Sequence, residues 1–521
     1  MSRKNRGVIE RWIIKGTLEL VTPTSLSNGD DDPLVDLPIV VDALEGVPLL
    51  TGASLAGALR AYLADCGDGY AEALFGGERR DPAGAQSALI VEDALGPKEQ
   101  ALRIELRDGV SIDPATRTAK ENERYDRQLL AAGTTFNLGF ELVVTAHDNA
   151  KKLRAGLATA LDALQKGAIR LGGRKRRGYG QCRVTLWQAW RFAFDSPADV
   201  AAWLAQGRED FDSARPADWT WGAADGGAGI GDWSALKDAP LLGHKTKSLR
   251  LSASFDIDGA VLIRHGFETE SGPDATQLRS HRNGRNVPVL SGTSLAGVIR
   301  SQALRIARTM AGRQRTEVAD AFVNSMFGQM PQPWPGISPK ERRELKKQAS
   351  RVTIDESEIV SSDRTGSPQD IVQTRVKIDR FTGGAFESAL FAEQPVFGGG
   401  VTLNLTLRLP TAAQLGLDVK ELTADEVKVL LQPYWDAEVG LLLLVLKDLW
   451  TGFLPVGGSS SVGRGRLQGR AAQIEYGSNK WTLVADGAEK VTLSPDGAAE
   501  TLNKYVTAFT QYVTGGRDGG Q

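Results

Sequence analysis

Three consecutive aspartates, Asp30, Asp31 and Asp32, follow the first apolar segment of the chain in the stretch SLSNGDDDPLVD. Carboxylate oxygens are ligands that Mg²⁺ prefers, and a carboxylate beside an RNA backbone can hold a hydrated Mg²⁺ or position a 2′-hydroxyl for attack. Three acids in a loop are equally typical of a polar turn without any catalytic role. Two interpretations therefore stay open: a nuclease loop in which Asp31 is the metal ligand, and a solvated acidic turn.

A glycine-rich loop further along the chain is strongly basic. Between Arg170 and Arg183 there are six Lys or Arg residues and no acid. Glycines let backbone amides come close to a phosphodiester chain, and the cations would neutralise its charge. We predict that RNA binds this loop, with a solvated basic turn as the alternative. The candidate contacts are Gly172, Gly173, Arg174, Lys175, Arg176 and Arg177.

Two expected helix starts share a pattern of small residues, GASLAG at 52–57 and GTSLAG at 292–297. The first turn of a helix has free backbone N–H groups and the positive end of the helix dipole, so it can bind a phosphate. An arginine follows one to two turns later in both. Simple N-capping is the alternative interpretation. The candidate phosphate contacts are Gly52, Ser54, Arg60, Gly292, Ser294 and Arg300.

These helix starts are part of an internal repeat. The segment VPLLTGASLAGALR at 47–60 recurs as VPVLSGTSLAGVIR at 287–300, with nine of fourteen positions identical and an offset of 240. Further along, Phe75-Gly76 corresponds to Phe327-Gly328 at an offset of 252. A long repeat of this kind is typical of a duplicated structural unit.

Two more segments extend the repeat in the same order. GVSIDPATRTA at 109–119 corresponds to RVKIDRFTGGA at 375–385, at an offset of 266. The glycines of the basic loop return in PVGGSSSVGRGRL, at an offset of 285, where Gly457, Gly458 and Arg464 are further candidates for RNA binding. Steadily growing offsets predict two homologous domains whose loops differ in length.

Each copy has the expected order strand, helix, strand, strand, helix, strand. That order predicts an α+β protein with two tandem ferredoxin-like domains, in which helices cover one face of an antiparallel sheet. The last helix of the second copy is expected at 425–449, interrupted near Pro433. The predicted divisions are a first domain at 1–195, a Trp- and Gly-rich linker or docking insertion at 196–248, a second domain at 249–470 and a C-terminal extension at 471–521.

Composition excludes several classes of protein. Of the 521 residues 41% are apolar and 24% charged, which is typical of globular proteins, and the net charge of −2 argues against a histone-like binder. The longest apolar run, Gly440 to Leu446, is far shorter than the roughly 20 residues of a membrane span, so we expect a cytoplasmic protein without a membrane segment. Two cysteines and four scattered histidines predict no structural metal, and no P-loop motif supports NTP hydrolysis.

The repeated segments resemble the RAMP superfamily of CRISPR-associated proteins, specifically the group-seven backbone subunits of type III effector complexes. The family hallmark reads approximately I-P-G-S-S-L-K-G-x-x-R, and both copies match it except that Ala56 and Ala296 replace the usual lysine. The resemblance implies two fused backbone subunits, as in type III-D-like complexes. Each domain would bind CRISPR RNA and would insert a thumb hairpin, containing Ile112-Asp113 or Ile378-Asp379, into the guide–target duplex.

The same resemblance implies a Mg²⁺-dependent cut in target RNA by an aspartate in the loop after the first strand. In the first copy this loop holds Asp30 to Asp32, and in the second copy the candidates are Glu268 and Asp274. The implied partners are CRISPR RNA, target RNA and other subunits of a type III complex. Two alternatives stay open: a guide-binding scaffold without turnover, and a metal-independent endoribonuclease that processes CRISPR RNA precursors.

Overall fold

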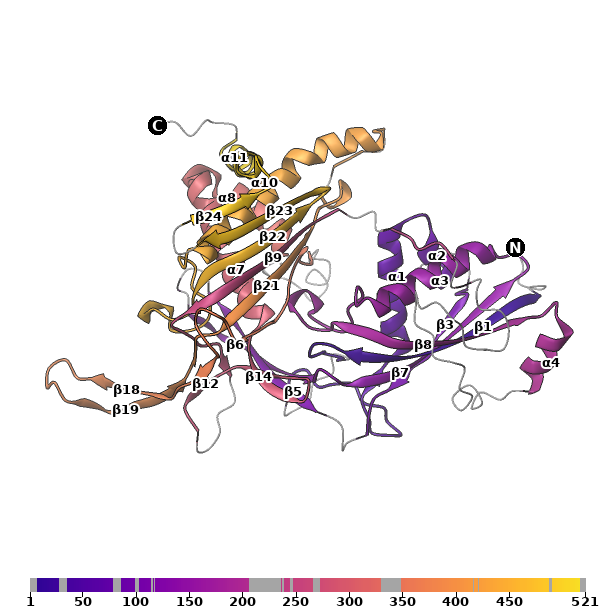
Figure 1. Ribbon diagram of the computed structural model, residues 1–521, viewed down its shortest axis with the longest axis horizontal. Helices are drawn as coiled ribbons and strands as arrows, with labels where there is room; N and C mark the ends of the chain where they lie inside the picture. Colours follow the sequence, from indigo (N-terminus) through magenta and orange to yellow (C-terminus); the bar gives the residue numbers. More distant parts are fainter. Residues whose placement is uncertain are drawn as a thin grey trace, which may run out of the picture.

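The chain folds into two α+β halves that follow one another along the long axis of the molecule (Figure 1). Each half has its own antiparallel sheet and its own apolar core, so the α+β class is confirmed. The computed structural model describes residues 7–27, 35–77, 86–98, 103–113, 116, 118–205, 236, 239–243, 247–265, 272–328, 348–415, 417–419, 421–486 and 490–515.

The first half contains a four-stranded sheet in the order β3-β7-β1-β8. Strand β1 is largely buried, and the side chains of Trp12, Ile14 and Leu18 are fully inaccessible. Two helices, α1 and α3, pack on this sheet, so the chain order is strand, helix, strand, strand, helix, strand. The elements of this half are β1 (Val8–Leu20), β2 (Leu49–Leu50), α1 (Gly52–Cys66), α2 (Tyr70–Phe75), β3 (Leu89–Val91), β4 (Ala94–Leu95), β7 (Thr135–Thr145), α3 (Ala150–Gln165), η2 (Lys175–Arg177), β8 (Cys182–Ala193) and α4 (Pro197–Ala205).

The second half repeats this arrangement in a six-stranded sheet of order β15-β21-β9-β22-β23-β24. The first four strands correspond one by one to those of the first half, and α7 and α10 correspond to α1 and α3. The main elements are β9 (Ser248–Asp258), α7 (Gly292–Ala311), α8 (Thr316–Phe327), β15 (Val352–Ile354), β21 (Gly400–Arg408), α10 (Ala424–Trp450) and β22 (Arg466–Tyr476). The short elements are β10 (Ala260–Val261), β11 (Arg264–His265), β12 (Ala275–Gln277), β13 (Arg279–Arg282), β14 (Arg285–Leu290), η3 (Arg313–Arg315), β16 (Ser357–Glu358), β17 (Gln369–Asp370), β20 (Val396–Phe397), η4 (Ala413–Leu415) and η5 (Ser460–Val462).

Each half inserts a long β-hairpin just before a strand of its main sheet, β7 in the first half and β21 in the second. The hairpins are β5 (Ile104–Ile112) with β6 (Ala119–Leu130), and β18 (Gln373–Ile378) with β19 (Ala385–Gln394). At the two tips Asp113 N–H donates to Thr118 O at 2.9 Å and Asp379 N–H donates to Gly384 O at 2.8 Å. Both aspartate side chains also accept backbone N–H bonds within the turn, so the repeated Ile-Asp motif sets the shape of the hairpin tip.

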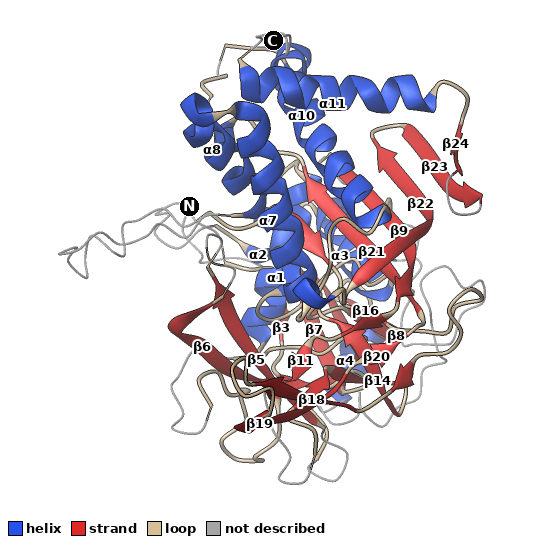
Figure 2. Ribbon diagram, turned by 90° about the vertical axis from the view of Figure 1, so that its left-hand side faces the viewer, coloured by secondary structure: helices blue, strands red, loops and turns tan. Residues whose placement is uncertain are grey.

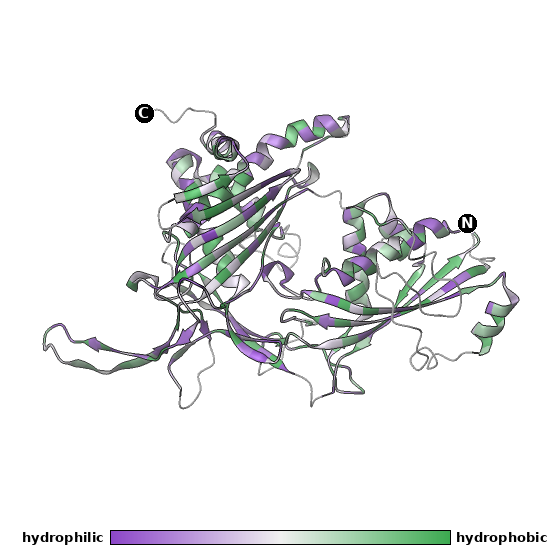
Figure 3. Ribbon diagram, in the orientation of Figure 1, coloured by the Kyte–Doolittle hydropathy of each residue, from purple (hydrophilic) through white to green (hydrophobic). Residues whose placement is uncertain are grey.

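The two hairpins have different surroundings. β18–β19 projects away from the body of the molecule, and Figure 3 shows apolar residues along it. Phe381 at its tip is 96% exposed and Leu390 69%. The hairpin β5–β6 lies against the second half instead, where a Glu105 carboxylate oxygen accepts from His281 N at 2.7 Å. The first hairpin therefore helps to join the two halves, and the second projects from the described part of the chain.

Helix α10 is continuous from Ala424 to Trp450, so the predicted interruption near Pro433 is wrong. Thr423 and Glu426 form a capping box at its start, which stabilises the first turns ahead of the proline. By length and composition alone, residues 425–450 could cross a membrane. Here the second part of α10 packs in the core of the second half, where Leu441 is fully buried.

The C-terminal extension adds β23 (Asn479–Asp486), β24 (Lys490–Ser494) and α11 (Ala498–Thr514) to the second half. Helix α11 lies across α10 (Figure 2), and the Tyr505 carbonyl sits where a side chain at Gly440 would be. Of the linker tryptophans, Trp203 on α4 packs edge-on against Phe192 with ring centroids 5.1 Å apart. Trp219, Trp221 and Trp233 lie outside the described residues, so a docking role for the linker stays a prediction.

Candidate nucleic-acid interface

The two glycine-rich loops have the same backbone conformation. Each has one left-handed residue, Arg174 or Ser459, then a single 3-10 turn, then a left-handed glycine, Gly178 or Gly463. The φ values of the two glycines are 90° and 87°. The repeat found in the sequence is therefore a repeat of conformation as well.

Each loop also packs beside the segment that follows the first strand of its half. Gly173 N–H donates to Ser25 O at 2.8 Å, and Gly458 N–H donates to Leu262 O at 2.7 Å. Ser25 and Leu262 are thus equivalent positions. The nominated acids Asp30, Asp31, Asp32 and Glu268 lie outside the described residues. Counted along the sequence, however, Asp31 and Glu268 are each the sixth residue after these equivalent positions.

The first loop docks onto the second half at the start of α7. A Cβ atom on Gly292 would lie 2.3 Å from Arg177 O and 2.6 Å from Ile354 O. A Cβ on Gly178 would lie 2.4 Å from Glu356 N. Protein carbonyls, and not an open space, therefore lie beside Gly292. A direct RNA contact at Gly292 stays a prediction.

Several cations of the first loop are used by this docking. Arg170 forms a 2.7 Å ion pair with Asp355, and Arg176 donates to the carbonyl of Ser350. Arg174 and Lys175 remain exposed, with Arg174 stacked 4.7 Å over the ring of Tyr125. The basic stretch thus contributes both to the junction between the halves and to the surface beside it.

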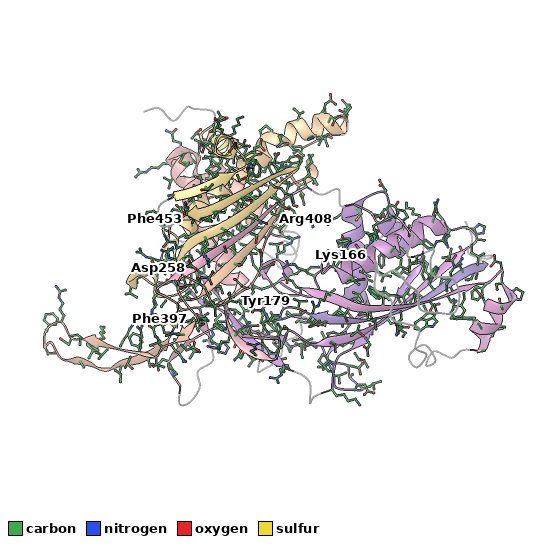
Figure 4. The ribbon with its side chains drawn as sticks, in the orientation of Figure 1. Lys166, Tyr179, Asp258, Phe397, Arg408 and Phe453 are labelled. Carbon is green, nitrogen blue, oxygen red and sulfur yellow. The ribbon has the colours of Figure 1, made fainter. Side chains whose placement is uncertain are left out.

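Several arginines form a cluster at this junction, and Arg127 among them acts on the pKa of Tyr179, which Figure 4 labels. Burial, and then the charges of Arg300, Arg174 and Arg176, lowers the pKa of Arg177 to about 10. Burial and Arg174 lower the pKa of Arg127, and burial lowers that of Arg300. The Nη1 of Arg177 is buried without a hydrogen-bond partner in the described part of the chain. Guanidinium groups that repel one another in this way form a site that an anion would stabilise.

A separate group of buried ion pairs holds the two halves together. Arg107 of the first hairpin bonds Glu356 at 3.1 Å and Glu105 at 2.7 Å, and Arg282 bonds Glu356 at 2.6 Å. The Glu356 side chain has no exposed area and Arg107 has 3%. Burial acts to lower the pKa of Arg107, but the charges of Glu356 and Glu105 outweigh burial and raise it. These residues carried no recognised signal in the sequence.

The hydroxyl groups at both helix starts take part in N-caps. Ser54 N–H donates to Thr51 Oγ1 at 3.3 Å, and Ser294 N–H donates to Ser291 Oγ at 3.2 Å. Gly52 N–H donates to Asp93 Oδ1 at 2.6 Å, so a carboxylate already occupies part of the first helix start. The N-capping interpretation therefore holds for both hydroxyls, and phosphate binding at Gly52, Ser54 and Ser294 stays a prediction.

The arginines that follow the two helix starts, Arg60 and Arg300, differ in their neighbours. Arg300 donates to Asn324 Oδ1 at 2.8 Å and is part of the arginine cluster, whereas Arg60 is half-buried on α1 without such neighbours among the described residues. In the second loop Arg464 is 5% exposed and forms a 2.7 Å ion pair with Glu393. Arg464 is thus directed into the protein, and Gly457 and Gly458 pack against the Leu262 carbonyl.

Asp274 has a structural partner in the second half. Its Oδ2 accepts from Ala392 N at 2.6 Å, as Asp36 Oδ2 accepts from Asp126 N at 2.8 Å in the first half. Both carboxylates thereby fix the returning strand of a hairpin. Among the described residues no group of three or more His, Cys, Asp or Glu side chains could hold a metal ion.

A comparison with known protein families shows which family the chain belongs to. The sequence matches the RAMP superfamily over residues 17–183 and 226–468, which together exceed half of the chain. The chain belongs to the RAMP superfamily. Each matched region contains one capped helix start and one glycine-rich loop, so the RAMP match follows the repeat seen in the structure. A search of curated proteins found no match.

Membership of the RAMP superfamily indicates a CRISPR-associated, RNA-binding subunit whose partners are CRISPR RNA and other Cas proteins. In this RAMP chain the arginine cluster is the described feature that fits an RNA backbone best. Sequence reasoning found Arg174, Arg177 and Arg300 but missed Arg127, which lies on a strand of the hairpin. No local pattern distinguishes Arg127 from the other charged residues of that strand.

Proposed function

We propose that this chain is a CRISPR RNA-binding backbone subunit of a type III effector complex, made of two fused ferredoxin-like RAMP domains. The strand orders β3-β7-β1-β8 and β15-β21-β9-β22, with a helix after the first and third strand of each, support the ferredoxin-like assignment. The two inserted hairpins support the comparison with backbone subunits. Guide RNA would run along the junction between the domains.

The observation that carries this proposal is the cluster of Arg127, Arg174, Arg177 and Arg300. No carboxylate is among the groups that shift the pKa of Arg177 or Arg127, and burial, together with the neighbouring arginines, lowers both pKa values. A phosphodiester group offers the acceptor that the buried Nη1 of Arg177 lacks. Exposed Arg174 and Lys175 would continue the contact to neighbouring phosphates.

A salt titration of RNA affinity tests the proposal. The double variant Arg127→Gln/Arg177→Gln should lower the slope of log K against log salt by about 1.4, because each lost contact to single-stranded RNA lowers it by about 0.7. The control is Lys480→Gln/Lys504→Gln, which removes two exposed cations far from the junction. A normal slope in the junction variant, with an unchanged melting temperature, would remove the cluster from the RNA path.

A second function, cleavage of target RNA, is supported by the equal spacing of Asp31 and Glu268 from the segments that pack on the two glycine-rich loops. In the first domain, Ser25 of this segment packs on the basic loop of the proposed RNA path. Mg²⁺ is the cofactor that this chemistry would use, and Asp31 is the residue that would hold it in the first domain. The scaffold alternative differs only in lacking this cleavage.

Mapping of cleavage products distinguishes the two. In the assembled complex with guide-complementary RNA, we expect Asp31→Ala to abolish one cut while guide and target binding stay intact, and Glu268→Ala to abolish a second cut if that domain is active. Asp274→Ala should leave every cleavage product in place, because the Asp274 carboxylate is used in a structural hydrogen bond from Ala392 N and not in the reaction. If no change in either loop alters any product, the scaffold function is correct and another subunit cuts.

A further inference from the structure

The second hairpin has a buried carboxylate at its root, and three arginines surround it. Glu393 lies on the returning strand β19, and 2% of its side chain is exposed. Arg464 of the second glycine-rich loop lies 2.7 Å from this carboxylate, Arg264 of β11 lies 3.3 Å from it and Arg375 of β18 lies 3.5 Å from it. Strands β11, β18 and β19 belong to one sheet. These four residues are called the hairpin-root site below.

The three arginines of the hairpin-root site differ in exposure. The side chain of Arg464 is 5% exposed, and its second Nη donates to Gln373 Oε1 at 2.6 Å, so its donors are used inside the protein. The side chain of Arg264 is 63% exposed and that of Arg375 is 33% exposed. In the described part of the chain Glu393 is the ion-pair partner of both. Three guanidinium groups thus share one carboxylate, and the excess positive charge belongs to the two arginines that reach the surface.

The first half has the opposite charge at the centre of the same place. Asp126 N and Ala392 N are equivalent, because each donates to an aspartate that precedes the helix start of its half. The residues that follow them, Arg127 and Glu393, are therefore equivalent too. The centre is a cation in the first half and an anion in the second.

The positions around this centre change in the opposite sense. They are identified by their place after the left-handed glycine, after the segment that packs on the loop, and on the outgoing strand of the hairpin. The residues there are Tyr179, Ser27 and Gly109 in the first half, and Arg464, Arg264 and Arg375 in the second. The carboxylate and its three cations thus occur together, in the second half only, as one unit.

The hairpin-root site has the donors that a phosphate group needs. Arg375 contacts Glu393 through Nε and Arg264 contacts it through one Nη, so each guanidinium group has further N–H donors. Two guanidinium groups side by side suit the oxygens of a phosphate. A Cβ on Gly458 would lie 3.9 Å from Arg264 Nε, so the backbone of the second glycine-rich loop borders the site without a side chain. The buried pair of Glu393 and Arg464 supports the two exposed arginines from below.

We propose that Arg264 and Arg375 together bind one phosphate group of RNA at the root of the second hairpin. The inference rests on the proposed RNA binding and extends the RNA path from the junction into the second domain. It also gives that domain an RNA contact although residues 459–462 of its loop contain no cation. The contact comes from the hairpin and from the strand before the acidic loop instead.

A salt titration of RNA affinity tests the site. Arg264→Gln/Arg375→Gln should lower the slope of log K against log salt by about 1.4, and Arg264→Gln alone by about 0.7. Arg264→Lys/Arg375→Lys keeps both charges and should keep most of the slope, and Lys480→Gln/Lys504→Gln is again the distant control. The melting temperature should stay normal, because Glu393 keeps its contact with buried Arg464. A fall with guide RNA alone assigns the phosphate to the guide, and a fall only after pairing assigns it to the target.

Combination with the junction variant separates this inference from the proposed function. Arg127→Gln/Arg177→Gln together with Arg264→Gln/Arg375→Gln should lower the slope by about 2.8, because the two sites bind different phosphates. A normal slope for Arg264→Gln/Arg375→Gln and for Arg264→Gln alone would overturn the inference, while a fall in the junction variant would leave the proposed function intact. A fall in the hairpin-root variants alone would support the inference and remove the junction from the RNA path.

Discussion

The two glycine-rich loops share one backbone conformation but have opposite surroundings. The first docks on the next domain, where Gly178 faces Glu356 N, and no described atom lies within 4 Å of a Cβ at Gly463 in the second. The first contains four consecutive cations and the second three serines and a valine. The duplicated loop has thus kept its shape while its side chains changed with its neighbour. The first loop is therefore a connector between the two halves as well as a candidate for binding RNA.

The largest loss of stability should come from removing Glu356, and Asp93 is the matched position in the first half. Each acid is the second residue after a carbonyl that fills the space at a helix-start glycine, Val91 at Gly52 and Ile354 at Gly292. Glu356→Ala leaves Arg107 and Arg282 buried without their shared partner, which should lower the free energy of unfolding by about 3–5 kcal/mol. Asp93→Ala removes one hydrogen bond to Gly52 at an exposed site and should cost about 1 kcal/mol. Thermal unfolding of both variants measures the difference. Equal melting temperatures would show that docking does not bury Glu356 as described.

The glycines Gly178 and Gly463 give a closer comparison. Both have φ near 90°, so an alanine costs each about 1–2 kcal/mol from backbone strain. Gly178→Ala adds a clash with Glu356 N at 2.4 Å, whereas Gly463→Ala meets no atom within 4 Å in the described part of the chain. We therefore expect Gly178→Ala to lower the melting temperature further than Gly463→Ala. If the two variants melt together, the first loop is not docked in solution.

The smallest effect concerns the exposed ends of the loops. Arg174→Ala/Lys175→Ala should lower the salt slope of RNA binding by about 1.4, by the same value per contact as above. The matched change Ser459→Ala/Ser460→Ala removes no charge and should leave the slope as it is. Neither pair should change the melting temperature by more than a degree or two. A slope that falls equally in both would mean that charge does not distinguish the loops.

The sequence predicted much of this fold because the repeat, the small-residue helix starts and the glycine spacing are local patterns. Gly172 and Gly457 pack on equivalent carbonyls, as their common spacing implied. Sequence reasoning could not show that Arg176 and Arg170 bind the second half, since a cation facing protein and one facing RNA have the same local pattern. A missed signal was IDESE at 354–358, whose acids Asp355 and Glu356 receive the loop and the first hairpin.

The prediction for α10 failed for a physical reason. Pro433 removes one backbone donor, but the capping box at Thr423 and the buried second part of the helix stabilise the turns on both sides of it. Tertiary packing thus overrode a local helix-breaking signal. Domain boundaries, the catalytic acids and the metal remain predictions, because they depend on residues outside the described part of the chain or on partners.

The most direct measurement of the central claim is a map of RNA crosslinks in the complex assembled on guide RNA. The account predicts crosslinked peptides from 119–130 and 170–183, where Tyr125 and Arg174 stack beside the arginine cluster. It predicts far fewer crosslinks at 459–463, where the loop has no cation. Crosslinks confined to the second loop, with none at the junction between the domains, would contradict it.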